Sequence, residues 1–129
     1  MNADVKREWL DGVSRSVIGA AQEMSTRLGF GFLEKVYENA LAMELRNRGL
    51  QVNQQHPIHV RYGEEIVGDY IADLPIENSL VVEIKAVSLL SRADQAQCIN
   101  YLRATGLSVC LLLNFGRPRL ELKSIVCNF

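Results

Sequence analysis

Apolar residues recur every three or four positions over two N-terminal stretches, which is the period of an amphipathic helix. The first stripe runs over residues 4–28 and is interrupted by Gly29-Phe30-Gly31. The second runs over residues 32–48, and Gly49 supplies a C-terminal stop. The pattern therefore predicts two helices before any strand.

Alternation with a period of two follows, which is typical of strands. It predicts strands over residues 51–62, 66–76 and 80–87, with a turn at Gly63 between the first two. The third of these is apolar on both faces except at Glu83 and Lys85. A strand with two apolar faces is typical of the centre of a sheet.

The last third of the chain predicts one helix and two strands. Ser91 stands three residues before an Asp, which resembles a capping box and starts a helix that reaches residue 104. Strands are expected over residues 107–114 and 120–126. The helical connection between the strands at 80–87 and 107–114 favours parallel neighbours. The order ααβββαββ predicts an α/β (α+β) domain in which helices flank a mixed central sheet.

Length and composition indicate one soluble domain over residues 1–129, with 48% hydrophobic and 22% charged residues. No apolar run approaches the ~18 residues of a membrane span, and the charged N-terminus does not resemble a signal peptide. A cytoplasmic protein without membrane contact is expected. Cys98, Cys110 and Cys127 lie in apolar surroundings and are expected to be buried free thiols.

The formal net charge of −1 lowers the expectation of tight, unassisted DNA binding. Proteins that bind nucleic acid through phosphate contacts usually carry a basic excess, which this chain lacks. A local basic cleft, or a metal that supplies positive charge at the site, remains compatible with this composition.

Asp73, Glu83 and Lys85 are the residues most suggestive of chemistry. Glu83 and Lys85 are two positions apart on one strand, so their side chains point to the same face. If the preceding loop is the three residues 77–79, Asp73 lies opposite Glu83 with their Cβ atoms roughly 4.5–5.5 Å apart. A loop of another length would separate them. The two carboxylates either share a divalent cation or form part of an ion-pair network in which Lys85 neutralises Glu83.

Asp73 together with Glu83-Ile84-Lys85 resembles the pattern of the PD-(D/E)XK nuclease-like superfamily, an Asp on one strand and (Asp/Glu)-x-Lys on the next. Gly31-Phe32-Leu33-Glu34-Lys35-Val36-Tyr37 is similar to the signature of the GxxExxY protein family, a branch assigned to that superfamily. Further similarity in residues 101–107 and 112–115 extends the resemblance over residues 17–126. It implies a restriction-endonuclease-like core.

The resemblance also implies a metal site that holds Mg²⁺ (or Mn²⁺). Asp73 and Glu83 would bind the ion, and Glu34 would be a third acidic ligand from the second helix. Lys85 would stabilise charge that develops on the phosphate and help to orient or deprotonate the attacking water. Without the resemblance, the helix dipole alone accounts for a carboxylate at Glu34.

Gln97 and Tyr101 share one face of the third predicted helix, four residues apart. Their spacing resembles a motif beside the active site of some exonuclease branches, which implies substrate-binding roles. Tyr37 lies three residues after Glu34 and is assigned either to packing, with its hydroxyl hydrogen-bonded, or to the same substrate-binding surface.

These observations leave two functions open. The first is a metal-dependent endo- or exonuclease that acts on nucleic acid. The second is a nuclease-like fold that binds nucleic acid or a protein partner without cutting. The near-neutral charge favours the second, as does Ile71, where similar sequences commonly carry a basic residue. A homodimer is a further alternative, although no residue pattern identifies an interface.

Overall fold

The computed structural model describes residues 2–127 and contains the three predicted helices. They are α1 (Ala3–Leu28), α2 (Glu34–Asn47) and α3 (Arg92–Thr105). The side chain of Asn2 caps α1 by accepting the Val5 N–H. Ser91 and Asp94 form the expected capping box of α3, which ends at Gly106 in the left-handed conformation.

The central sheet is mixed, as the sequence predicts. Its four strands are β3 (Leu74–Ile76), β4 (Leu80–Lys85), β5 (Val109–Asn114) and β6 (Glu121–Val126), in the order β3-β4-β5-β6. β4 and β5 are parallel, and the other neighbours are antiparallel. Helix α3 supplies the crossover between β4 and β5, so that expectation is confirmed.

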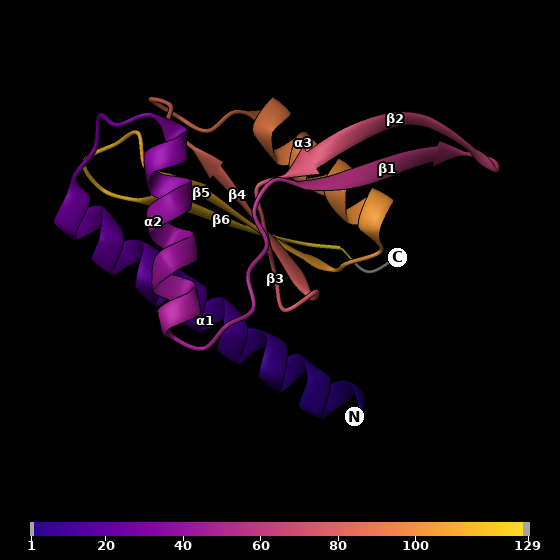
Figure 1. Ribbon diagram of the computed structural model, residues 1–129, viewed down its shortest axis with the longest axis horizontal. Coiled ribbons are helices and arrows are strands. Elements are labelled where there is room, and N and C mark those ends of the chain that lie inside the picture. The colour runs from indigo at the N-terminus through magenta and orange to yellow at the C-terminus, as the bar shows by residue number, and fades with distance from the viewer. Residues whose placement is uncertain (1, 128–129) are drawn as a thin grey trace.

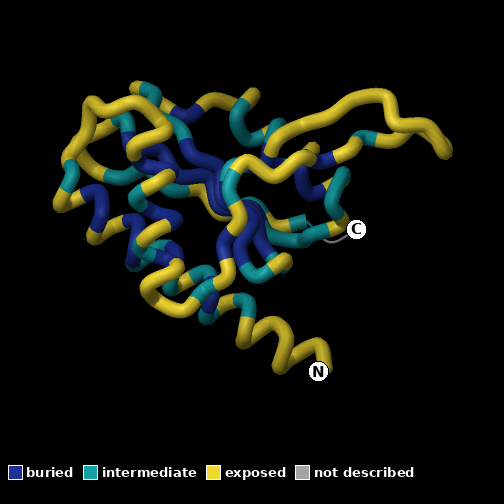
Figure 2. The backbone as a smooth tube through the Cα atoms, in the orientation of Figure 1, coloured by how far each residue is buried: buried dark blue, intermediate teal, exposed yellow. Residues whose placement is uncertain are grey.

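The remaining strands, β1 (His56–Tyr62) and β2 (Glu65–Ala72), form a separate antiparallel hairpin. This hairpin, which we term the arm, projects from the core (Figure 1) and is exposed over most of its length (Figure 2). The prediction of one continuous strand over residues 66–76 is therefore wrong. Ala72 pairs with β1, whereas Leu74 pairs with β4 in the central sheet, and Asp73 lies between them.

Asp73 interrupts the strand because its carbonyl and carboxyl groups form hydrogen bonds outside a regular β-ladder. Its carbonyl oxygen accepts the Gln55 N–H at 2.9 Å, and its side-chain Oδ2 accepts the Ile84 N–H at 2.9 Å. Asn53 N donates to Pro75 O in the same crossing segment, at 3.1 Å. The chain thus leaves one sheet and enters another at the residue that carries the candidate carboxylate.

The two faces of the central sheet are covered by different helices (Figure 1). Leu80, Val82 and Ile84 of β4 point into the larger core, which includes apolar residues of α1 and α2. On the opposite face Val81 packs with Tyr101 of α3. Because side chains alternate along a strand, Glu83 and Lys85 share the α3 face.

Cys98 and Cys110 are buried free thiols, as expected, and Cys127 is a free thiol that is only partly buried. No helix within residues 2–127 is both long and apolar enough to cross a membrane.

Candidate active site

Asp73 and Glu83 lie side by side at the junction between the arm and the central sheet. Ile76 pairs with Leu80, so the β3–β4 loop has the expected three residues, and this register brings Asp73 opposite Glu83. The Asp73 N–H lies 3.4 Å from Glu83 Oε1. The conditional prediction from loop length therefore describes the observed geometry.

The two carboxyl groups, of which Glu83 is buried and Asp73 partly buried, have no positive partner within the described residues. Glu83 is only 4% exposed, and neither Asp73 nor Glu83 forms an ion pair with any residue in the range 2–127. Burial, followed by the charge of Asp73, raises the pKa of Glu83 from 4.5 to about 10. An ion-pair network in which Lys85 neutralises Glu83 is therefore not the observed arrangement.

Lys85 lies on the same sheet face but turns toward α3. Its Nζ is 3.4 Å from Gln97 Oε1 and 3.9 Å from Asp94 Oδ1. The side chain keeps 22% of its surface exposed, so the ammonium group is accessible from solvent. An accessible cation beside two uncompensated carboxylates is suited to bind an anionic ligand next to a metal.

Gln97 and Tyr101 join this cluster from α3, as their spacing predicts. Gln97 Nε2 donates to the Tyr101 hydroxyl at 3.1 Å, and that hydroxyl donates to Ile71 O at 3.1 Å. Burial, followed by the charge of Glu83, raises the pKa of Tyr101, so the phenol stays protonated near neutral pH. Tyr101 therefore holds the last residues of β2 and orients Gln97 toward Lys85.

The α2 carboxylate connected to Asp73 is Glu38 rather than Glu34. Glu34 is exposed at the first position of α2, and its side chain forms no hydrogen bond or ion pair within the described part of the chain. Glu38, one turn later, is 4% exposed and accepts from Gln55 Nε2. The same Gln55 nitrogen lies 3.2 Å from Asp73 Oδ1. A metal-binding role for Glu34 stays a prediction.

Sequence reasoning missed Glu38 and Gln55, although one signal for Glu38 was present. Glu38 directly follows Tyr37 in the apolar stripe of α2, where a carboxylate is out of place. Gln55 gave no signal, because it reaches the site through a positive φ of 53°. Such a backbone conformation is uncommon for a residue other than glycine and is often found at functional sites.

Tyr37 belongs to the core, which is the packing alternative. It is fully buried, and its ring stacks on Phe115 with centroids 4.8 Å apart. Its hydroxyl donates to Gly29 O at 2.9 Å and accepts from Phe32 N at 3.2 Å. With no exposed surface and a satisfied hydroxyl, Tyr37 cannot touch a substrate, so its substrate-binding assignment is corrected. Its role is to fix the loop that precedes α2.

The donor set fits a hard divalent cation. Within residues 2–127 no three His, Cys, Asp or Glu side chains are grouped closely enough to form a full protein metal site. Mg²⁺, however, is commonly held by one or two carboxylates and keeps several waters. Asp73 and Glu83 match that requirement, because they lie close together and no cationic side chain within residues 2–127 pairs with them.

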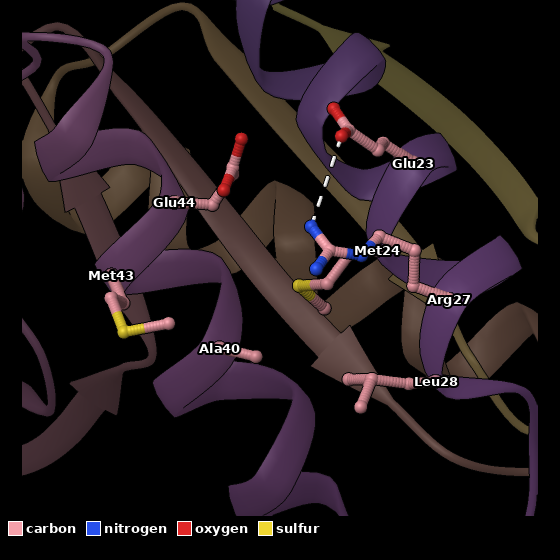
Figure 3. A pocket seen from close by; sticks show the side chains of 7 residues that line it. All are labelled: Glu23, Met24, Arg27, Leu28, Ala40, Met43 and Glu44. Atoms are coloured by element: carbon pink, nitrogen blue, oxygen red, sulfur yellow. Dashed lines mark ion pairs between the residues drawn. The ribbon is translucent and has the colours of Figure 1, made fainter.

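A hollow between α1 and α2 is separate from this cluster. It has a volume of about 260 Å³ and includes Met24, Leu28 and Met43 in its lining, with an ion pair of 3.9 Å between Arg27 and Glu23 (Figure 3). None of the acidic or basic residues of the candidate site lines it.

One of three comparisons with known proteins gave a match. A family model described as the PD-(D/E)XK nuclease superfamily matches residues 11–125, which include Asp73, Glu83 and Lys85. Searches of curated proteins and of solved structures gave no match. Because the family model spans most of the chain, with the mixed sheet and flanking helices of a restriction-endonuclease-like fold, the chain belongs to the PD-(D/E)XK nuclease superfamily.

Proposed function

We propose that this protein is a metal-dependent nuclease of the GxxExxY branch that hydrolyses phosphodiester bonds in nucleic acid. The single observation that supports the proposal best is the close pair of partly buried Asp73 and buried Glu83, which forms no ion pair with a cationic side chain in the described residues. Ionising both members of such a pair is costly without a cation, so the pair is explained most simply by a ligand that displaces the Glu83 proton and neutralises both carboxylates.

In this proposal Asp73 and Glu83 hold Mg²⁺ or Mn²⁺. The bound ion supplies Lewis-acid activation of a phosphoryl oxygen and a more acidic water. Asp73 is well placed because the Ile84 N–H and the Gln55 amide fix both of its oxygens. Fixed ligands lower the reorganisation needed on binding. Glu34 is retained as a third acidic candidate, and Glu38 acts on Asp73 indirectly, through Gln55.

Lys85 is proposed to bind the scissile phosphate and to stabilise the negative charge that grows on it. Gln97 keeps the ammonium group oriented, since its Oε1 lies 3.4 Å from Lys85 Nζ. Tyr101 in turn keeps Gln97 in place through the hydrogen bond of 3.1 Å. Hydrolysis would proceed by direct attack of water, with no covalent enzyme intermediate.

The test is cleavage of single- and double-stranded DNA and RNA in the presence of Mg²⁺ or Mn²⁺. Glu83→Gln and Lys85→Met should each lower the cleavage rate by about 10²-fold or more, since each removes a charge at the reacting phosphate. Glu65→Gln and Lys123→Met are matched controls, because both residues are exposed on strands outside the site. Equal cleavage by all five proteins would identify a contaminating nuclease and reject the proposal.

The alternative, a fold that binds without cutting, is favoured by the lack of a three-ligand metal cluster within the described residues. Calorimetric titration with Mn²⁺ separates the two functions. Binding that disappears in Asp73→Asn supports the nuclease. A wild-type protein that takes up no Mn²⁺, with or without nucleic acid present, supports the binding module instead.

A further inference from the structure

A groove between the arm and α3 lies next to the candidate site, and the residues that line it have no part in the proposed reaction. It has a volume of about 430 Å³, within the range of roughly 300–1,000 Å³ typical of ligand pockets. β1 contributes His59 and Arg61, β2 contributes Tyr70, and α3 contributes Asn100 and Arg103. The arm that forms its outer wall projects beyond the core (Figure 1).

The charge of the groove differs from that of the whole chain, which is −1. Two arginines line it and no carboxylate does. Within residues 2–127, the Arg103 side chain forms no hydrogen bond or ion pair, and that of Arg61 hydrogen-bonds only to the Glu64 carbonyl, at 3.4 Å. Neighbouring Asp69 contacts His59 at 2.6 Å and forms no ion pair with either arginine. Guanidinium groups without a protein partner are suited to bind phosphates.

Tyr70 adds an exposed aromatic surface to the same groove. Its side chain is 44% exposed, and its ring meets Tyr101 edge-on, with centroids 5.7 Å apart and planes at 86°. An aromatic ring beside basic side chains is the combination by which proteins bind unpaired bases, since every base has a face that can stack.

The groove is linked to the candidate site through side-chain contacts, although Lys85, Gln97 and the two carboxyl groups do not line it. Tyr70 contacts Tyr101, the Tyr101 hydroxyl accepts from Gln97, and Gln97 accepts from Lys85. A strand that lies along Arg61 and Arg103 would therefore lie close to Tyr101, whose hydroxyl bonds Gln97 of the candidate site. Base-paired nucleic acid fits this path poorly, because its bases are not free to stack on Tyr70 and the groove is of small-ligand size.

We propose that this groove binds single-stranded nucleic acid, with Arg61 and Arg103 on consecutive phosphates and one unpaired base on Tyr70. The position of the cut rests on the nuclease function proposed above, but the binding itself does not. The groove thus assigns a substrate class to the site: a single strand, or the unpaired end of a duplex, that enters beneath the arm.

The test is fluorescence anisotropy of the full chain in EDTA, so that no cleavage occurs. Labelled strands of about ten nucleotides, which lies within the usual footprint of single-strand binders, are used as DNA, as RNA and as the corresponding duplex. The single strands should bind at least about tenfold more tightly than the duplex. The DNA and RNA arms then show whether the groove distinguishes the two sugars.

Variants assign the contacts. Arg61→Gln and Arg103→Gln should each reduce the slope of log K against log salt by about 0.7, the value for one phosphate contact to a single strand. Arg15→Gln, an exposed arginine on α1, is the matched control and should leave the slope unchanged. Tyr70→Leu should lower the affinity about tenfold while keeping the wild-type slope, because stacking involves no counterion release.

The outcomes separate this proposal from the nuclease function. The predicted binding without any Mn²⁺-dependent cleavage would support the groove and reject the activity. The opposite outcome is also informative. If the Arg61 and Arg103 variants bind and cut single strands as the wild type does, the proposed binding role of the groove is rejected and the nuclease activity is supported. Tighter binding of duplex, or no binding of any strand, would also overturn the groove.

Discussion

Replacing Glu83 by Gln is expected to stabilise the metal-free protein at neutral pH while removing its ability to bind metal. Gln has the shape of a protonated Glu but cannot ionise. Burial and the neighbouring charge of Asp73 raise the pKa of Glu83 to about 10. The wild-type native state therefore holds a proton that the unfolded chain releases above its ordinary pKa of 4.5.

The sign and size follow from this difference. Stability from Glu83 is complete below about pH 4.5 and falls as the pH rises toward about 10, because the unfolded state binds fewer protons over that range. The loss is about 1.4 kcal/mol per pH unit, so raising the pH from about 5.5 to about 7.5 costs about 3 kcal/mol. Sharing of the proton with Asp73 makes this an upper value.

The assay is urea unfolding of wild type and Glu83→Gln at both pH values, in EDTA. The difference in unfolding free energy between the two proteins should grow by about 2–3 kcal/mol at the higher pH. Glu65→Gln, which changes an exposed Glu of the arm, should follow the wild type at both pH values. Mn²⁺ should remove the pH dependence of the wild type, because the cation displaces the proton.

Parallel pH profiles for wild type and Glu83→Gln would refute the reasoning. They would mean that Glu83 is ionised in the native state and that some other group compensates it. The carboxylate of Glu83 would then already be compensated and would no longer support a metal site.

Four further outcomes can be measured on the same protein. Gly116→Ala should destabilise the protein by about 3 kcal/mol in urea unfolding, since the new Cβ would lie 2.4 Å from the Val87 backbone. Gly12→Ala in α1 should instead stabilise it by about 1 kcal/mol, because the new Cβ would enter open space and Ala favours the helix. Asn114→Leu should cost about 2–3 kcal/mol in the same assay, because buried Asn114 bonds both the N–H and the carbonyl of Val87. Mn²⁺ in excess of its dissociation constant should raise the melting temperature of wild type but not of Asp73→Asn, measured by circular dichroism.

Much of the fold could be predicted because local patterns and global packing agree. The stripes of α1 and α2, the capping box at Ser91 and the two apolar faces of β4 each have one structural meaning, and each is observed. The parallel pairing of β4 with β5 followed from the helix between them. The register that places Asp73 beside Glu83 followed from the loop over residues 77–79.

The rest depended on contacts that no local pattern encodes. The sequence predicts one strand over residues 66–76, because the change of pairing partner from β1 to β4 at Asp73 does not alter the alternation of apolar and polar residues. Gln55 reaches Glu38 and Asp73 through a crossing segment and a positive φ. The groove brings Arg61 of β1 near Arg103 of α3, two elements that β2, β3 and β4 separate in sequence.

The single residue between β2 and β3 has a mechanical consequence. Ala72 pairs within the arm and Leu74 pairs within the central sheet, so Asp73 is the whole connection between β2 and β3. A tilt of the hairpin relative to the central sheet would change the backbone dihedral angles of Asp73, and these angles also direct its carboxylate. The orientation of Asp73, a proposed metal ligand, thus depends on the position of the arm, which extends into solvent.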